Sequence, residues 1–385
     1  MWLKSSSRYL FLHGISSFHS RFCHFFYRSA FFLYTLFFVS ILQAGWAQKP
    51  RTQFNGFGHT EYFMESTKDH SYSYFTIGEH DFFVTSSLTD KISFLGEFVI
   101  RFNDKSATGF FPSIERSFIR FNYYKNHHLI VGKIHTPVNY WNDVYHHGRV
   151  FFPAVERPVA FSHLVPLHTL GVQMQGQNLG NSNFGYDLVV GNGIASSDGF
   201  SADIAPSLTA AFHFKPKTGM RIGGSYYYNN ITGNGRGAHS GHSDPRLTNY
   251  TGPVYKGNVK FHLLSASFAY FNNRYEVLNE FAYNLTKTDS LGLAQNATNY
   301  LYAGWRINDK SIPFIHIDWM QISDKDLHTY GYKVGRYAIG YRHEFTHQIN
   351  LKSELEYQSA DRHMQGGSHA AHNHFVFKLQ LAYAF

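Results

Sequence analysis

The sequence predicts an all-β chain that folds as a transmembrane antiparallel β-barrel of about sixteen strands. Three observations indicate this fold class. Only 16% of the 385 residues are charged and 18% are aromatic, whereas about a quarter of a typical soluble domain is charged. Segments that alternate apolar and polar residues recur along the chain, as expected when one strand face meets lipid and the other water. The connections between these segments alternate between short polar turns and longer loops.

The mean hydropathy of −0.30 argues against a bundle of membrane-spanning helices. A barrel exposes only every second strand residue to lipid, so its average hydropathy stays low. Beyond residue 47 no apolar run reaches the roughly 20 residues that a spanning helix needs. The 38 Phe and 27 Tyr residues favour strands.

The first 47 residues are expected to be a secretory signal peptide, followed by a single barrel domain over 48–385. Four basic residues precede an apolar run at 30–42, and small residues just beyond it favour cleavage before Gln48. The only cysteine, Cys23, lies in this leader, so the mature chain has no disulfide or thiolate chemistry. The mature chain keeps 30 of the Lys and Arg residues against 26 Asp and Glu. The resulting charge of +4 is too small to indicate a nucleic-acid partner.

Sixteen alternating segments are the expected strands, an even number as in bacterial single-chain barrels. In the segment 312–322, for example, Ile315 and Ile317 share one face while His316 and Asp318 share the other. The expected strands span 53–63, 73–87, 92–103, 115–124, 128–134, 169–177, 184–192, 206–214, 220–229, 257–271, 275–286, 299–307, 312–322, 332–344, 348–359 and 374–385.

The connections predict the topology. Those after even-numbered strands are short and rich in turn-forming residues, as at 89–90, 125–127, 215–218, 272–274, 308–310 and 346–347. Those after odd-numbered strands are longer, at 64–72, 104–114, 135–168, 193–205, 230–256, 287–298, 323–331 and 360–373. Short turns on one rim and long loops on the other are expected of an outer-membrane barrel with both termini on the short-turn side. A two-layer sandwich has no reason to produce this parity.

The last expected strand, HFVFKLQLAYAF at 374–385, is amphipathic and ends on phenylalanine. It resembles the closing strand of bacterial outer-membrane β-barrel proteins, in which the terminal aromatic strand is read by the assembly machinery. We expect Leu379 and Leu381 to face lipid, and Lys378 and Gln380 to face the barrel interior. Arginine at Leu379 is then expected to cost about 2–4 kcal/mol, and arginine at Gln380 to be tolerated.

Across nearly the whole mature chain the architecture resembles the general diffusion porins, and loosely the phosphate-selective porins. The resemblance implies a location in the bacterial outer membrane, contact with lipid and a homotrimer. It also implies passive diffusion of ions and small polar solutes through a water-filled channel. A sixteen-strand barrel is indeed too wide for side chains to fill. In general porins the third loop folds into the barrel, so the connection 135–168 is the candidate constriction.

Charged residues in this connection and on the expected inner strand faces are the candidates for lining the channel. The connection contributes Asp143, Arg149, Glu156 and Arg157, with Trp141, Phe151, Phe152 and Phe161 as expected anchors to the wall. The strands contribute Arg101, Arg116, Arg120, Arg306, Asp318, Arg336, Arg342, Glu354 and Glu356, together with Glu97, Glu276 and Glu280. The basic set favours anions, but the acidic set nearly balances it and favours a weakly selective pore. We slightly prefer the second interpretation.

The sequence also bears on functions other than a channel. A surface barrel that acts as an adhesin or receptor without an open pore remains the alternative. An enzyme is not expected, because no GxSxG elbow or similar nucleophile motif occurs. Histidine is abundant, with 25 residues, but its spacing in the expected fifth and last loops matches no closed metal site, so neither metal nor cofactor is expected. These loop histidines are His239, His242, His363, His369, His372 and His374.

Overall fold

A computed structural model describes residues 51–68, 70–102, 109–146, 148–194, 206–231, 259–289, 291–326, 332–363 and 369–385. The expected signal peptide lies outside the described residues, as do His239 and His242. Within the described ranges, no helix is both long and apolar enough to cross a membrane.

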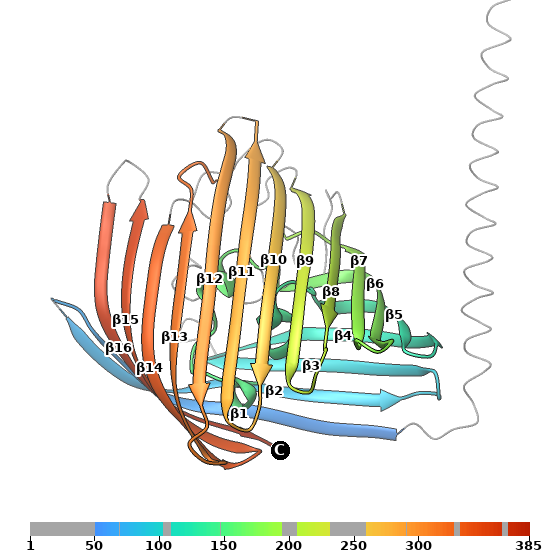
Figure 1. The fold of residues 1–385 in the computed structure, drawn as a ribbon, viewed down its shortest axis with the longest axis horizontal. Helices are drawn as coiled ribbons and strands as arrows, with labels where there is room; N and C mark the ends of the chain where they lie inside the picture. The colour runs from blue at the N-terminus through green and yellow to red at the C-terminus, as the bar shows by residue number, and fades with distance from the viewer. Residues whose placement is uncertain are drawn as a thin grey trace, which may run out of the picture. The chain divides into compact units, whose positions relative to one another are not determined.

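Sixteen strands form one closed barrel in which sequence neighbours pair and β1 pairs with β16 (Figure 1). The strands are β1 Arg51–Ser66, β2 Ser71–Ser87, β3 Ile92–Phe102, β4 Phe110–Tyr124, β5 His127–His135, β6 His168–Leu179, β7 Phe184–Gly191 and β8 Ser207–Phe214. They continue as β9 Met220–Ile231, β10 Val259–Phe271, β11 Tyr275–Thr288, β12 Gly292–Trp305, β13 Ser311–Ile322, β14 Tyr332–Thr346, β15 Ile349–His363 and β16 His369–Ala384. The predicted fold class is therefore confirmed.

The barrel closes through the last strand, as its sequence predicts. Thr60 of β1 lies opposite Leu381 of β16 in an antiparallel ladder. Closure leaves no strand edge with unpaired backbone groups, which a membrane-spanning sheet requires. On β16, Lys378 and Gln380 are buried on the inner face, while Leu379 and Leu381 are exposed on the outer face. The predicted facing of this strand is confirmed.

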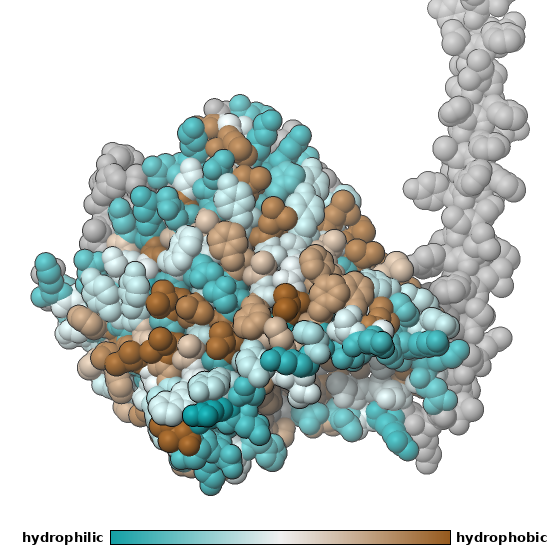
Figure 2. Space-filling view, viewed as in Figure 1, coloured by the Kyte–Doolittle hydropathy of each residue, from teal (hydrophilic) through white to brown (hydrophobic). Residues whose placement is uncertain are grey.

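The outer face of the barrel is apolar over much of its height. Figure 2 shows hydrophobic side chains gathered across the middle of this surface, with hydrophilic ones toward its upper and lower parts. Exposed apolar residues occur at every second position of a strand, as in Ile315, Ile317 and Trp319 of β13. The residues between them, His316 and Asp318, are buried inside the barrel. This period of two is the pattern that predicted the strands.

Two predicted long loops are shorter in the structure, and in one of them, 360–373, β15 continues to His363 and β16 begins at His369. Residues 287–298 were expected to connect two strands, but β11 continues to Thr288 and β12 begins at Gly292. Small and polar residues fill the inner face there, where Asn296 Nδ2 donates to Asn284 Oδ1 at 2.6 Å. A polar run reads as a loop in the sequence, but it fits a strand because the inner face of a wide barrel is itself polar.

The connection from β5 to β6, residues 136–167, lies inside the barrel, and we call it the inner segment. It contains three short helical turns: η1 Trp141–Tyr145, η2 Arg149–Phe151 and η3 Val159–Ser162. Its apolar residues share a buried cluster with inward-facing residues of β9 to β13. The segment is therefore part of the barrel's core.

Candidate functional site

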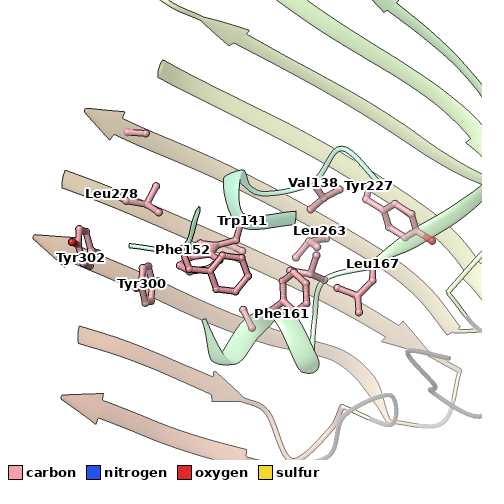
Figure 3. Packing of buried hydrophobic residues seen from close by; sticks show 14 of the residues in the cluster. Val138, Trp141, Phe152, Phe161, Leu167, Tyr227, Leu263, Leu278, Tyr300 and Tyr302 are labelled. Atoms are coloured by element: carbon pink, nitrogen blue, oxygen red, sulfur yellow. The ribbon is translucent and has the colours of Figure 1, made fainter. Parts of the chain in front are cut away.

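Aromatic side chains anchor the inner segment to the barrel wall. Trp141 and Phe152 are each 1% exposed, and their ring centroids lie 4.8 Å apart. The Trp141 ring meets Tyr300 of β12 edge-on, with centroids 5.6 Å apart (Figure 3). Phe161 is buried in the same cluster. Phe151, also expected as an anchor, is 57% exposed, so three of the four predicted anchors pack as expected.

Carboxylates on the strands bind the backbone of the inner segment. A segment outside a ladder or long helix needs other partners for its buried N–H groups. Here three inward-facing carboxylates accept hydrogen bonds from three backbone N–H groups of the segment. The bonds run from Trp141 to Glu280 (3.0 Å), from Val155 to Glu354 (3.1 Å) and from Val159 to Asp318 (2.5 Å).

Strand side chains also donate to the carbonyl groups of the segment. Arg342 Nη1 donates to the Pro153 carbonyl at 2.9 Å. Lys352 Nζ donates to the Ala154 carbonyl at 3.3 Å. Together with the carboxylate bonds, these contacts hold the segment's backbone against β11, β13, β14 and β15. The wall supplies the donors and acceptors that the segment cannot supply itself.

Three charged residues of the segment form ion pairs with the wall. Arg157 makes a two-pronged contact with Glu79 of β2, at 2.8 and 3.3 Å. Glu156 Oε1 lies 3.0 Å from Lys378 Nζ of β16. Asp143 pairs with Arg221 of β9. The fourth predicted charge, Arg149, donates to the Val155 carbonyl at 2.5 Å and stacks over the Phe152 ring at 5.5 Å.

Burial and neighbouring charges shift the pKa values of two residues of the segment, Glu156 and Arg157. Burial alone would raise the pKa of Glu156, but the Lys378 ammonium and the Arg149 guanidinium lower it below its ordinary value of 4.5. The carboxylate form therefore binds the wall. For Arg157, burial lowers the pKa against the opposing effect of Glu79.

Four of the strand candidates lie beneath the inner segment. They are Asp318, Arg342, Glu354 and Glu356, exposed by 1%, 5%, 1% and 1%. Arg342 Nη2 also binds both carboxylate oxygens of Glu276, at 2.7 and 2.9 Å. Asp318, Arg342 and Glu354 bond to the segment, and Glu356 lies close to Glu354. This departs from the expectation that the polar strand faces are open to water.

The remaining arginine candidates lie on the inner side of the barrel, and most of them form ion pairs. The pairs are Arg101 with Glu79 (3.3 Å) and Glu115, Arg116 with Glu97, Arg306 with Glu276 (2.9 Å) and Glu344 (3.1 Å), and Arg336 with Glu356 (4.0 Å). Arg120 instead lies over the Phe118 ring at 5.8 Å, and no carboxylate among the described residues pairs with it.

A cavity of about 1200 Å³ lies inside the barrel between η1 and the inner faces of β4, β5, β6, β8, β9 and β10. It reaches the short turns, whose residues Asn183 and Thr218 help to line it. Its charged lining comprises five Lys and Arg residues and one carboxylate: Arg116, Arg120, Lys215, Lys217, Arg221 and Asp143. The structure thus brings three predicted residues, Arg116, Arg120 and Asp143, to one space.

Sequence reasoning missed the other three charged residues of this cavity. Lys215 and Lys217 were assigned to a turn, and their place at the cavity depends on how that turn meets its neighbours. Arg221 had a detectable signal, because it alternates with the exposed Ile222 and shares its face with the buried Ser225 and Tyr227. Strand period alone would have placed it inside.

No protein-family model matches the sequence, and no curated protein matches it. Solved structures do match the fold. The anion-selective porin from Comamonas acidovorans is similar with a TM-score of 0.63 at 10% identity, over 88% of this chain and 100% of that chain. In-vitro folded OmpT of Vibrio cholerae, in its trimer form, gives 0.60 at 12% identity, over 88% and 100%. Salmonella typhi OmpF in complex with daunomycin gives 0.57 at 10% identity, over 87% and 97%.

At such low identities the likeness shows the fold alone. The chain is a sixteen-strand barrel that structurally resembles the bacterial outer-membrane general porins, without a sequence-level family. The architectural resemblance expected from the sequence is confirmed.

Proposed function

We propose that this protein is an outer-membrane porin that lets ions and small polar solutes diffuse passively through a water-filled channel. One observation carries the proposal. The inner segment is bonded to one side of the barrel, and a polar cavity of about 1200 Å³ remains on the other side. A closed structural barrel has no need of such a space, whereas a diffusion channel requires one.

The inner segment is the proposed constriction. Its bonds to Glu280, Asp318 and Glu354 hold it over the inner faces of β11, β13 and β15. Solutes then pass between η1 and the inner faces of β4, β5, β6, β8, β9 and β10. The wall under the segment is excluded from the passage, so its charges hold the segment and do not line the channel.

Only the charges on the part of the wall beside the cavity can influence which ions pass. The acidic residues that balanced the basic ones in the sequence, Asp318, Glu354 and Glu356, are buried beneath the segment. The cavity keeps five Lys and Arg residues, and its one carboxylate, Asp143, pairs with Arg221. Rings of Arg and Lys favour anionic solutes. We therefore assign the channel a preference for anions, in place of the weak selectivity that the balanced sequence favoured.

The proposed location is the bacterial outer membrane, where lipid covers the apolar outer face. The structures of similar fold are outer-membrane proteins, and that of OmpT includes a trimer form. We propose a homotrimer here as well. The assembly machinery that reads a terminal aromatic strand would act on β16, because the strand lies at the closure of the barrel.

Conductance in planar lipid bilayers tests the proposal. The refolded protein should give discrete current steps, and a KCl gradient should give a reversal potential with chloride more permeant than potassium. Deleting 144–155 should increase the conductance, because η2 and the part of the segment bonded to β14 and β15 are lost.

Three results would count against the proposal. A folded barrel that carries no current would favour the alternative of a surface adhesin or receptor. Unchanged conductance in the deletion variant would remove the constriction role. A reversal potential near zero would remove the anion preference.

A further inference from the structure

Three histidines meet at the base of the inner segment. His135 ends β5 and His168 begins β6, and the two are opposite residues in the β5–β6 ladder. His146 follows η1 and stacks on His135, with ring centroids 3.6 Å apart. The centroids of His146 and His168 are 4.7 Å apart. One ring nitrogen from each of the three lies within 4.8 Å of the other two.

The three rings lie in a buried and acidic environment. The side chains of His135 and His168 are 10% and 3% exposed, and His146 is 1% exposed. His168 Nε2 lies 3.0 Å from a Glu115 carboxylate oxygen, and His135 Nε2 lies 3.7 Å from one of Glu97. Each carboxylate also pairs with an arginine: Arg101 binds the other oxygen of Glu115, and Arg116 binds the Glu97 oxygen that lies near His135.

The neighbours of His146 orient it as a ligand. Its Nδ1 lies 2.7 Å from Asn142 Oδ1. An amide oxygen only accepts hydrogen bonds, so Nδ1 carries the proton and Nε2 keeps its lone pair. The Asn142 amide in turn donates to the Thr136 carbonyl at 2.7 Å and the Leu167 carbonyl at 3.1 Å. Outer partners of this kind orient the histidine ligands of metal sites.

His146 also has an unusual backbone conformation, with φ of 37°. A residue with a side chain rarely adopts positive φ, and where it does the surrounding structure dictates it. Here that conformation goes with a His146 ring that contacts both His135 and His168, whose own ring centroids lie 5.5 Å apart.

We propose that His135, His146 and His168 bind a divalent transition-metal ion, Zn²⁺ in particular, which fastens η1 to the junction of β5 and β6. Three imidazoles are a known ligand set for zinc, and Glu115 is placed to act as a fourth ligand or an outer partner. Zn–N bonds are about 2.0–2.1 Å long, so the nitrogens must draw together by ~1 Å, which side-chain rotation provides. His135 lines the cavity, which gives the ion a route from water.

A second group of potential ligands among the described residues is weaker. His316, Glu354 and Glu356 also come together, but they offer one imidazole. Both oxygens of Glu354 have partners, Val155 N at 3.1 Å and His316 Nε2 at 3.2 Å. Transition-metal ions such as Zn²⁺ favour imidazole over carboxylate ligands, so the three-histidine group is the one that we assign.

Calorimetry with Zn²⁺ tests the site directly. The refolded full-length protein, stripped with a chelator and held in detergent, should bind one ion per chain saturably. His146→Ala should weaken this binding by more than the ~10–100-fold lost when only an outer partner is removed. His213→Ala is the matched control, because His213 is equally buried and lines the same cavity but belongs to no described ligand group. It should bind Zn²⁺ like the wild type.

Further variants keep the test decisive. His239→Asn with His242→Asn removes histidines elsewhere in the chain and should leave the binding intact. His168→Gln is a second ligand variant for use if His146→Ala does not refold, as judged by its β-sheet circular dichroism. Co²⁺ should give the visible absorption of a nitrogen-rich, four-coordinate site in the wild type and the control variants, and not in the two ligand variants. Equal affinity in the wild type and both ligand variants, or no saturable binding in the wild type, would overturn the proposal. Neither readout depends on whether the barrel conducts.

Discussion

The backbone N–H of Val155 donates a 3.1 Å hydrogen bond to the carboxylate of Glu354, a residue 199 positions later in the chain. The other oxygen of that carboxylate lies 3.2 Å from His316 Nε2. Glu354 is 1% exposed, and a buried carboxylate is costly unless it is paired and hydrogen-bonded. The inner segment and the wall therefore supply each other's buried hydrogen-bonding partners. Removing either partner should weaken the attachment of the segment to the wall.

Replacing Glu354 with alanine should release the middle of the inner segment. The loss of a buried ion-pair partner is expected to lower the free energy of unfolding by about 3–5 kcal/mol. Single-channel conductance should rise, because the segment loses one of its bonds to β15. Glu354→Gln, which keeps an acceptor for Val155, should have a smaller effect on both quantities. Equal conductance in all three proteins would show that this contact does not hold the constriction.

Charge at Arg120 should control ion preference. Arg120→Glu is expected to lower the chloride-to-potassium permeability ratio several-fold, because Arg120 lines the cavity and no described carboxylate neutralises it. Lys260→Glu makes the same change of charge on an exposed strand residue outside the cavity lining and should leave the ratio near that of the wild type. Reversal potentials in a KCl gradient measure both. Equal shifts in the two variants would mean that overall charge, and not the cavity, sets selectivity.

The Glu156–Lys378 pair should make the stability of the inner segment depend on acid pH. Because the folded-state pKa of Glu156 lies below 4.5, its contribution is present above pH 4.5 and is lost as the pH falls through the folded pKa. Glu156→Gln lacks the charge at every pH. The difference in free energy of unfolding between wild type and variant should therefore be largest above pH 4.5 and shrink below it. A difference that does not change between pH 7 and 3 would contradict the assignment.

Two neighbouring residues of β6 test which face of the strand meets lipid and which meets the cavity. Met174 is 44% exposed on the outer face, whereas Gln175 lines the cavity. Met174→Arg should cost about 2–4 kcal/mol, as for arginine facing lipid near the bilayer midplane. Gln175→Arg should cost little, because the guanidinium would lie in water. Unfolding by guanidinium in lipid vesicles measures both, and equal costs would overturn the facing.

The earlier expectation that arginine is tolerated at Gln380 needs correction. Gln380 is fully buried, and its amide donates to Glu61 at 2.9 Å and accepts from Lys352 at 3.3 Å. The prediction of its face was right, but the prediction of its surroundings was wrong. Alternation shows which side of the sheet a residue faces, whereas the packing on that side depends on a segment more than 200 residues earlier in the chain.

The strands of this protein could be predicted because their signal is local. Ile315 and His316 differ in hydropathy and sit next to each other, so the period of two shows in a window of a few residues. The same signal predicted the closing strand and the faces of Lys378 and Leu379. It failed at Gly292, where a strand with a polar inner face and few apolar outer residues looked like a loop.

The candidate site was only partly predictable from local pattern. The residues 135–168 were expected to lie inside the barrel because the third loop of general porins does so, and Trp141, Phe152 and Phe161 were expected to anchor them because they are aromatic. The histidine group at His135, His146 and His168 was not predicted. Two of its members are brought together by the β5–β6 ladder, and the third depends on the turn that follows η1.

Composition, alternation and turn spacing were therefore sufficient to predict the sixteen-strand barrel and the side of the sheet that strand residues face, whereas the resemblance to general porins indicated which segment enters the interior. The structure was needed to divide the inward-facing charges into those beneath that segment, such as Glu354, and those beside the cavity, such as Arg120. The reason is physical. Side-chain direction follows from neighbouring residues, but burial, pairing and access to water depend on contacts such as that between Val155 and Glu354, which exist only when distant parts of the chain have folded together.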